Sequence, residues 1–207
     1  MISINTSRAR PWGGRRKREE LAMRVITGTA RGRRLKELEG LETRPTTDRV
    51  KEGIFNVIQF DIEGRRVLDL FAGTGQLGIE ALSRGAASAV FVDQRREAVS
   101  LVRENLSLTG FSQRARVVGG EALGFLASAR ERFDLIFLDP PYASGLLAAA
   151  VGAVSQFDIL SNHGIMICES PLDEEPPAVE PPYFQRRVYR YGKTKVTAYC
   201  REEEREA

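Results

Sequence analysis

The sequence is poor in the residues from which metal sites and histidine-dependent catalytic sites are built. Its 207 residues include one histidine, His163, and two cysteines, Cys168 and Cys200. A single histidine disfavours a zinc site or a Ser–His–Asp triad, because such sites depend on histidine. Both cysteines lie in strand-like stretches, which favours reduced thiols in the core of a cytoplasmic protein over a disulfide framework. We therefore expect a cytoplasmic protein without a metal.

Long apolar runs are absent as well. No stretch of eighteen apolar residues occurs, so the sequence predicts no membrane-spanning helix and no membrane partner. Hydrophobic residues make up 42% of the chain, which is enough for the core of one main domain. Because no large unexplained apolar surface is evident, we expect a monomer.

Net charge is small, at +3, but it is distributed unevenly. Residues 1–35 carry ten Lys and Arg against two acids, whereas the rest of the chain carries 21 basic and 26 acidic residues. A basic end on an acidic body is typical of an arm that binds a polyanion. Residues 1–22 show no periodic apolar face, so for them we favour a basic, disordered extension. After Met23, short β-prone pieces alternate with glycine and arginine, and we expect a small hairpin unit over residues 23–43.

Residues 44–207 are expected to form one α/β domain. Thr46 or Thr47 can cap a first helix that is apolar along one side. Strand-like and helix-like segments then alternate, which predicts a parallel sheet with helices on both faces. The expected strands cover 66–73, 87–93, 114–120, 133–142 and 163–170, and the expected helices cover 74–85, 95–110, 121–130 and 145–157. The final stretch QRRVYRYGKTKVTAYCR predicts two antiparallel strands about a turn at Gly192 and Lys193, which makes seven strands in all.

The segment GTGQLG, which starts at Gly73, follows the first expected strand and opens a helix. It matches the pattern G-x-G-x-x-G, and Asp93 lies 20 residues after its first glycine, at the end of the second strand. This spacing alone would suit a dinucleotide. Asp69 argues against one, because a carboxylate beside the helix N-terminus opposes a pyrophosphate. It favours a ligand with an ammonium or sulfonium group, and S-adenosylmethionine carries both.

The remaining cofactor contacts follow from the ends of the strands. Glycines 73 and 75 allow the backbone to approach a ligand closely. Asp93 could accept hydrogen bonds from ribose hydroxyls. Glu121 could accept one from the adenine amine while Ala122 offers its backbone amide, or Glu121 could simply be an acid favoured at a helix N-terminus. All of these positions fall at the carboxyl ends of parallel strands, where open α/β sheets bind ligands.

The fourth expected strand ends in the unusual segment DPPY. Two prolines cannot continue a sheet ladder, so the strand stops rigidly after Asp139. The Asp139 carboxylate and the Pro140 carbonyl could accept both hydrogens of an exocyclic amine on a purine and so favour a pyramidal nitrogen with an exposed lone pair. The prolines would hold that carbonyl still, and Tyr142 could stack on the base. Such a reaction needs no strong base, which agrees with the lack of histidine.

At these residues the sequence resembles class I S-adenosylmethionine-dependent methyltransferases that act on amino groups. The stretch MRVITGTARGRRL, followed by TRPTTDRVKEGIFNVI, resembles the RsmD family of bacterial ribosomal RNA methyltransferases more specifically. The resemblance extends from Met23 to about Arg201 and implies a Rossmann-like class I methyltransferase fold. It also implies methylation of N2 of guanine 966 in 16S ribosomal RNA, within the small ribosomal subunit or its precursor.

The resemblance and the patterns together define three sets of residues. The predicted catalytic residues are Asp139, Pro140, Pro141 and Tyr142. The predicted cofactor-binding residues are Thr46, Asp69, Phe71, Gly73, Thr74, Gly75, Asp93, Gln94, Glu121, Ala122 and Asp139. The predicted RNA-binding residues are Arg24, Arg31, Arg33, Arg34 and Arg44, which would contact phosphate and so position the RNA rather than read its sequence. Related enzymes often carry Asp where this chain has Glu121.

Three other functions remain open from the sequence. An adenine-N6 methyltransferase of DNA or RNA would use the same DPPY chemistry, although such DNA enzymes often carry a separate recognition domain. A non-catalytic RNA-binding protein would need only the basic hairpin and would have no use for Asp69 and Asp139. A nicotinamide oxidoreductase is disfavoured by Asp69 and by the presence of a single mononucleotide-binding half.

Overall fold

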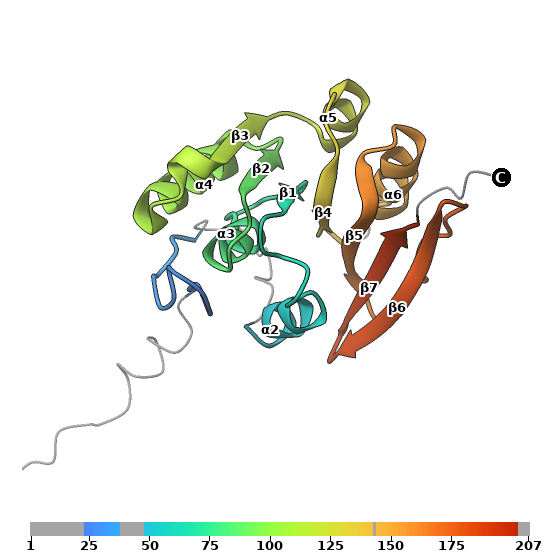
Figure 1. The fold of residues 1–207 in the computed structure, drawn as a ribbon, viewed down its shortest axis with the longest axis horizontal. Coiled ribbons are helices and arrows are strands. Elements are labelled where there is room, and N and C mark those ends of the chain that lie inside the picture. Colours follow the sequence, from blue (N-terminus) through green and yellow to red (C-terminus); the bar gives the residue numbers. More distant parts are fainter. Residues whose placement is uncertain (1–22, 38–47, 143, 203–207) are drawn as a thin grey trace, which may run out of the picture.

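The computed structural model describes residues 23–37, 48–142 and 144–202. Residues 1–22, most of the link to the first helix, and the predicted site residues Arg44 and Thr46 therefore lie outside the described part. Within it, the chain forms the predicted α/β architecture (Figure 1). The strands are β1 (Arg66–Asp69), β2 (Ser88–Asp93), β3 (Ala115–Gly119), β4 (Phe133–Leu138), β5 (Leu160–Pro171), β6 (Tyr183–Tyr191) and β7 (Thr194–Arg201). The helices are α2 (Asp48–Val57), α3 (Gln76–Ser83), α4 (Arg96–Thr109), α5 (Ala122–Ser128) and α6 (Leu146–Gln156), with a short 3-10 helix at Ser112–Arg114.

The seven strands form one sheet in the order β3-β2-β1-β4-β5-β7-β6. Strands β1 to β5 run parallel, and β7 pairs antiparallel with both β5 and β6. The predicted C-terminal hairpin is confirmed, with its turn at Gly192, whose φ of 61° suits glycine. The strand order reverses between β1 and β4, and in open α/β sheets this is the position where ligands bind.

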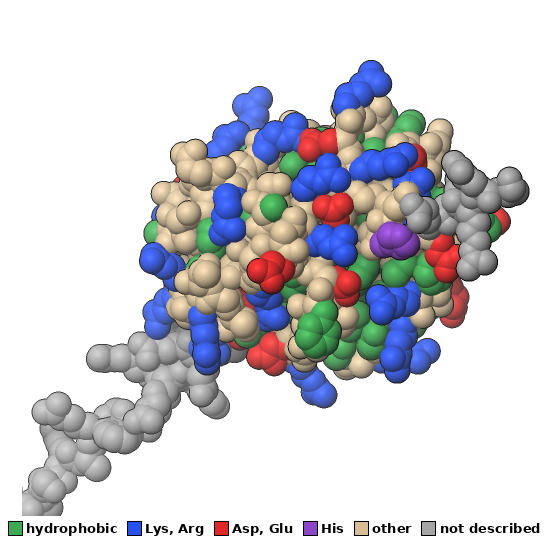
Figure 2. Space-filling view, in the orientation of Figure 1, with side chains coloured by type: hydrophobic (Ala, Val, Ile, Leu, Met, Phe, Trp, Pro, Cys, Tyr) green, Lys and Arg blue, Asp and Glu red, His purple; other side chains and the backbone are tan. Residues whose placement is uncertain are grey.

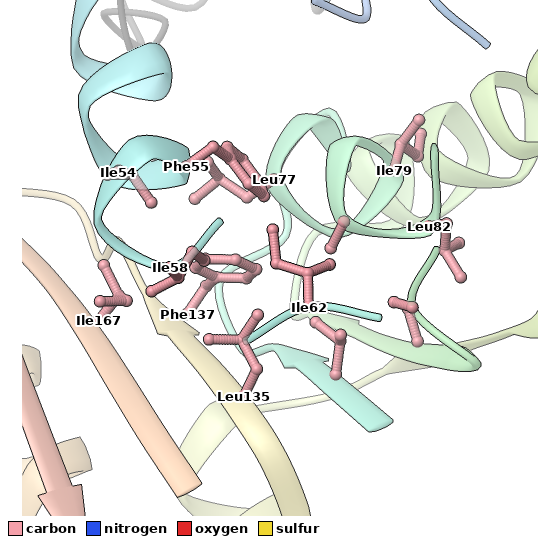
Figure 3. Packing of buried hydrophobic residues seen from close by; sticks show 14 of the residues in the cluster. Ile54, Phe55, Ile58, Ile62, Leu77, Ile79, Leu82, Leu135, Phe137 and Ile167 are labelled. Atoms are coloured by element: carbon pink, nitrogen blue, oxygen red, sulfur yellow. The ribbon is translucent and has the colours of Figure 1, made fainter. Parts of the chain in front are cut away.

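Helices cover both faces of the sheet, as predicted. One hydrophobic cluster joins α2, α3 and α4 to one face, and a second joins α5 and α6 to the other. Near the centre of the first cluster, Phe55 of α2 meets Phe137 of β4 with ring centroids 5.7 Å apart. Ile54 of α2, and Ile58 just after the helix, belong to the same cluster as Phe137 and Leu135 (Figure 3). The apolar side of α2 is thus explained by burial against the middle of the sheet.

The segment from Met23 to Glu37 doubles back on itself and packs against the domain. An isolated antiparallel bridge joins Arg24 to Arg34, and Leu35 donates a backbone hydrogen bond to Met23. Four of its apolar side chains belong to the first hydrophobic cluster; they are Met23, Val25, Ala30 and Leu35. Asn105 of α4 holds the far end of the segment by accepting from the Lys36 amide at 2.8 Å and donating to the Lys36 carbonyl at 3.1 Å. This docking brings the segment to the edge of the sheet where the strands end.

Candidate active site

The carboxyl ends of β1, β2 and β4 open onto a cavity of about 640 Å³. Cavities that hold small ligands fall in the range of about 300 to 1,000 Å³. Twelve of the residues predicted for the site line it: Asp69, Phe71, Gly73, Thr74, Asp93, Gln94, Glu121, Ala122, Asp139, Pro140, Pro141 and Tyr142. The structure therefore brings the glycine loop and the DPPY segment to one place, although they lie on different strands.

The glycine loop closes tightly around the start of α3. Gly73 and Gly75 both have positive φ, of 56° and 79°, a conformation that glycine adopts without strain. The Gly73 amide donates to the Asp93 carboxylate, so the loop after β1 is tied to the end of β2. Gly75 is buried and does not line the cavity. A Cβ there would meet Ile79 and Val102 at 3.3 Å, so Gly75 holds the turn against the core.

Asp69 lies at the floor of the cavity, almost completely buried at 2% exposure. Its Oδ2 accepts a hydrogen bond of 2.9 Å from the Gly78 amide in the first turn of α3. Burial raises the pKa of Asp69 to about 7, the Gly78 hydrogen bond opposes that rise, and the charges of Asp139 and Asp93 add to it. A buried carboxylate with two acidic neighbours is a site that favours a cationic group.

The DPPY segment stands beside Asp69 across the β1–β4 pair. Asp69 is in register with Phe137, so Asp139 follows two residues beyond, where the strand ends. Pro140 is buried, and the Tyr142 side chain is 41% exposed. The Tyr142 hydroxyl donates to Oε1 of Glu169 at 3.2 Å. Burial raises the pKa of Tyr142, and the nearby charges of Glu169 and Asp139 raise it further. An exposed ring with a tethered hydroxyl provides a flat surface of fixed orientation.

Several residues that line the cavity were not predicted from the sequence. The main polar ones are Glu37, Gln76, Arg95 and Glu169. Arg95 forks onto the Asp93 carboxylate. Glu37 accepts from the Met23 amide at 3.0 Å, and the Thr74 hydroxyl lies 3.2 Å from the Met23 sulfur. Arg95 could have been found from its position two residues after Asp93, but the other contacts depend on how the chain folds back.

The residues of the cavity fit S-adenosylmethionine. The buried Asp69 suits its ammonium or sulfonium group, and Asp93 stands at the end of β2, where a ribose would be held. Glu121 and Ala122 lie at the start of α5 and also line the cavity, as an adenine contact requires. When bound, this cofactor supplies an electrophilic methyl group on a positively charged sulfur.

The predicted RNA-binding arginines lie on the surface of the docked N-terminal segment. Arg24, Arg31, Arg33 and Arg34 are all exposed. Arg33 donates to the Leu108 carbonyl at 2.9 Å, and Arg24 lies 3.8 Å from the Asp48 carboxylate. On the face shown in Figure 2, Lys and Arg side chains are spread widely, with Asp and Glu among them. On this face, the basic side chains are therefore not gathered into one patch.

Membrane-spanning helices and metal sites were sought among the described residues. None of their helices is long and apolar enough to cross a membrane. Over residues 23–37, 48–142 and 144–202, no group of three or more His, Cys, Asp and Glu side chains is placed to hold a metal ion.

Comparison with known proteins gives consistent matches over most of the chain. The family model described as "Conserved hypothetical protein 95" matches residues 23–200. The chain is 35% identical over 185 residues to ribosomal RNA small subunit methyltransferase D of Escherichia coli, which covers 89% of this chain and 93% of that protein. It is 42% identical over 180 residues to a Bacillus subtilis protein provisionally named rRNA methyltransferase YlbH, covering 86% of this chain and 98% of the relative.

Solved structures show the same fold. The Escherichia coli protein yhhF, provisionally named a methyltransferase, superposes with a TM-score of 0.80 at 33% sequence identity. The match covers 88% of this chain and 99% of yhhF. A conserved hypothetical protein of Streptococcus pyogenes superposes with a TM-score of 0.69 at 37% identity, over 74% of this chain and 96% of that one. The predicted class I methyltransferase fold is confirmed by these neighbours and by the strand order.

Proposed function

Because the chain belongs to the RsmD family of methyltransferases, we propose that it transfers a methyl group from S-adenosylmethionine to the exocyclic N2 amine of a guanine in 16S ribosomal RNA. The relatives named as ribosomal RNA small subunit methyltransferase D support the RNA substrate. One structural observation carries the proposal. The DPPY segment at the end of β4 lines the same cavity as Asp69, the glycine loop and Asp93.

One group of residues in this cavity holds the cofactor, and a second group positions the amine. Asp69 and Asp93 anchor the cofactor from the ends of β1 and β2. The Asp139 carboxylate and the Pro140 carbonyl accept the two hydrogens of the amine, which turns the nitrogen lone pair out of conjugation with the ring. Tyr142 stacks on the base and fixes its plane. The amine nitrogen would form a bond to the methyl carbon as the carbon–sulfur bond breaks, S-adenosylhomocysteine would leave, and the methylated amine would then lose one proton to solvent.

The reaction can be tested directly on ribosomal particles. Purified protein is incubated with methyl-labelled S-adenosylmethionine and small subunits that lack methylation, and the labelled nucleoside is then identified. We expect N2-methylguanosine at a single site. N6-methyladenosine would keep the chemistry and replace the substrate, whereas no label on any RNA would count against the proposal.

The role of Asp139 can be separated from that of the cofactor site. Asp139→Ala should abolish transfer, because the amine loses one of its two acceptors, while binding of S-adenosylhomocysteine is largely kept. Asp173→Ala, at an exposed aspartate outside the cavity, is the matched control and should retain activity. An equal loss of cofactor affinity and activity in Asp139→Ala would contradict the assignment.

The N-terminal segment supplies the proposed RNA contacts. Arg31 and Arg34 are exposed, and each arginine that neutralises a phosphate should steepen the dependence of log affinity on log salt by about 0.7 to 0.9. Replacing both with alanine should weaken RNA binding and reduce this slope by about 1.5 in total. Arg130→Ala, beyond α5 and distant from the segment in sequence, is the control and should leave the slope unchanged. An unchanged slope in the double variant would exclude these arginines from the interface.

A further inference from the structure

The cavity contains a buried carboxylate for which the methyl transfer described above has no use. Glu169 lies on β5, is 6% exposed, and lines the cavity together with Asp139 and Tyr142. Buried carboxylates are uncommon in proteins because removal of the charge from water is costly. Because Glu169 lines the part of the cavity where the base would be held, we consider a role in recognition of the base.

The sheet places Glu169 next to Asp139. Strands β4 and β5 run parallel with Leu138 opposite Cys168, and Asp139 and Glu169 directly follow this last pair. Neighbouring strands lie about 4.8 Å apart, which makes these two carboxylates neighbours along the edge of the sheet. Both residues line the cavity, so they lie on the same side of this edge of the sheet. Phe137 and Ile167, two residues earlier on each strand, belong to the same hydrophobic cluster.

Tyr142 links the two carboxylates to the expected plane of the base. Its hydroxyl donates to Glu169 Oε1, so Glu169 lies at the hydroxyl end of the ring. The charges of both Glu169 and Asp139 act on this hydroxyl. A purine stacked on Tyr142, with its amine at Asp139 and at the Pro140 carbonyl, would therefore present the neighbouring atom of the same edge toward Glu169.

That neighbouring atom differs between the two candidate purines. In guanine, C2 lies between N1 and N3, and the atom beside the amine on the Watson–Crick edge is N1, which carries a hydrogen. In adenine, the atom beside the C6 amine is also N1, but it carries a lone pair. An ionised carboxylate can only accept hydrogen bonds. It would therefore bind the guanine edge and oppose the lone pair of adenine, and a site built around a donor discriminates strongly against analogues that lack it.

We propose that Glu169 accepts a hydrogen bond from N1–H of the target guanine and thereby determines the specificity for guanine over adenine. This inference rests on the proposed function and adds the means by which the base is chosen. Glu169 is a specificity-determining residue and takes no part in the transfer of the methyl group.

The test replaces the target guanine by 2-aminopurine in otherwise identical RNA assembled into small subunits. This base keeps the amine on C2 but has a lone pair at N1. For the unaltered protein, we expect kcat/KM to fall by about tenfold to a hundredfold, as for a lost hydrogen bond to a charged group. 6-Thioguanine, which keeps N1–H and changes only the oxygen at C6, is the control substrate and should be methylated at a rate close to that of guanine.

The variant Glu169→Gln tests the residue itself. Its amide can donate to the N1 lone pair of 2-aminopurine or accept from the N1–H of guanine, so the preference between the two bases should fall toward one. A merely structural role would lower both rates by the same factor and leave the preference unchanged. The thermal midpoint and the affinity for S-adenosylhomocysteine should remain those of the unaltered protein.

The outcomes separate this inference from the proposed function. Equal rates of the unaltered protein on guanine and 2-aminopurine would overturn the role of Glu169, even if Glu169→Gln failed to fold. A parallel loss on both substrates in Glu169→Gln would also overturn it. Failure of the unaltered protein to methylate the guanine substrate would instead remove the proposed function, and the inference with it.

Discussion

The side chain of Arg95 forms hydrogen bonds with the Asp93 carboxylate, at the position where a ribose would be held. Oδ1 of Asp93 accepts from the Arg95 amide at 2.9 Å and from Arg95 Nε at 3.2 Å. Oδ2 accepts from the Gly73 amide at 2.9 Å and from Arg95 Nη2 at 3.2 Å. A carboxylate offers about four acceptor positions, so these four donors fill it. Ribose hydroxyls that bind Asp93 must therefore displace the guanidinium.

Removal of the Arg95 side chain should accordingly tighten cofactor binding. The guanidinium is about one-third exposed, and partly exposed ion pairs contribute up to about 1 kcal/mol, so we expect Arg95→Ala to lower the Kd for S-adenosylhomocysteine by about two- to fivefold. Titration calorimetry measures this change. Arg96→Ala, at the exposed neighbouring residue, is the matched control and should leave the Kd unchanged. Weaker binding in Arg95→Ala would mean that Arg95 contacts the cofactor itself.

Asp69 should make the stability of the protein depend on pH. Its pKa is about 7 in the folded protein, mainly because of burial, and about 3.9 in an unfolded chain. Below pH 4 both states are protonated and Asp69 has no effect. Between pH 4 and pH 7 the folded state keeps a proton that the unfolded state has lost, so stability falls as pH rises. Above pH 7 the full cost is present, about 4 kcal/mol by order of magnitude.

Asp69→Asn should remove this dependence, since an amide can still accept from the Gly78 amide and does not ionise. The free energy of unfolding, measured with urea between pH 4 and pH 8, should favour the variant increasingly as pH rises. Asp173→Asn, at an exposed position, should follow the curve of the unaltered protein. Parallel curves for Asp69→Asn and the unaltered protein would show that Asp69 does not keep its proton in the folded state.

The sequence was sufficient for the parts of the site that depend on local pattern. Asp69, Asp93 and Asp139 each follow an apolar strand, and parallel strands bring their carboxyl ends to one edge. Glu169 also lies at the carboxyl end of its predicted strand, so the same rule could have found it, but only the register of β4 with β5 shows that it lies beside Asp139. Strand β5 is also longer than predicted, from Leu160 to Pro171, since it pairs along both of its edges.

Contacts between distant segments account for the rest of what the sequence did not show. The Ile26 amide donates to a Glu80 carboxylate 54 residues away, and the Lys36 amide donates to Asn105, 69 residues away. Neither acceptor has a local signature that names its partner: Asn105 lies in an amphipathic helix, and Glu80 lies in a helix whose residues are all buried. Met23 and Glu37 reach the cavity only through this docking. The positions of Glu80 and Asn105 within their helices therefore did not reveal that they hold the N-terminal segment.

Glu80 should be the main attachment of the N-terminal segment. Its fully buried carboxylate accepts from the Ile26 amide at 2.7 Å, from the Thr27 amide at 2.9 Å and from Arg84 at 2.9 Å. The buried Lys51 lies 4.0 Å away, and burial lowers its pKa. Glu80→Ala would leave buried amides and cations without this acceptor. We expect it to lower the free energy of unfolding by about 3 to 5 kcal/mol.

The matched control for Glu80 is an exposed glutamate that also pairs with a lysine. Glu104 lies 2.7 Å from Lys36, and both side chains are about half exposed, so Glu104→Ala should cost less than about 1 kcal/mol. Limited digestion with trypsin should cut Glu80→Ala faster after Arg31 and Arg33, whereas Glu104→Ala should resist like the unaltered protein. Equal stability and equal digestion of the two variants would show that Glu80 does not hold the segment.

Gly78 is expected to be irreplaceable for reasons of packing. A Cβ at this position of α3 would lie 2.3 Å and 2.7 Å from two carbons of the buried Phe91 ring. Phe91 sits in the middle of β2 and has no exposed surface, so either the ring or the helix must move. Overpacking of this kind costs about 1 to 3 kcal/mol, which exceeds the gain of up to about 1 kcal/mol from alanine in a helix. Gly78→Ala should therefore unfold at a lower urea concentration.

The displacement of α3 should also reach the cofactor site, because the Gly78 amide donates to Asp69. Gly78→Ala should then weaken the binding of S-adenosylhomocysteine as well as the fold. Gly152→Ala is the matched control: Gly152 lies on the exposed side of α6, a Cβ there would meet nothing within 4 Å, and the variant should be more stable by up to about 1 kcal/mol. If Gly78→Ala instead gained stability like Gly152→Ala, α3 would have room to move away from β2. The position of the Gly78 amide relative to Asp69 would then have to be maintained by other contacts.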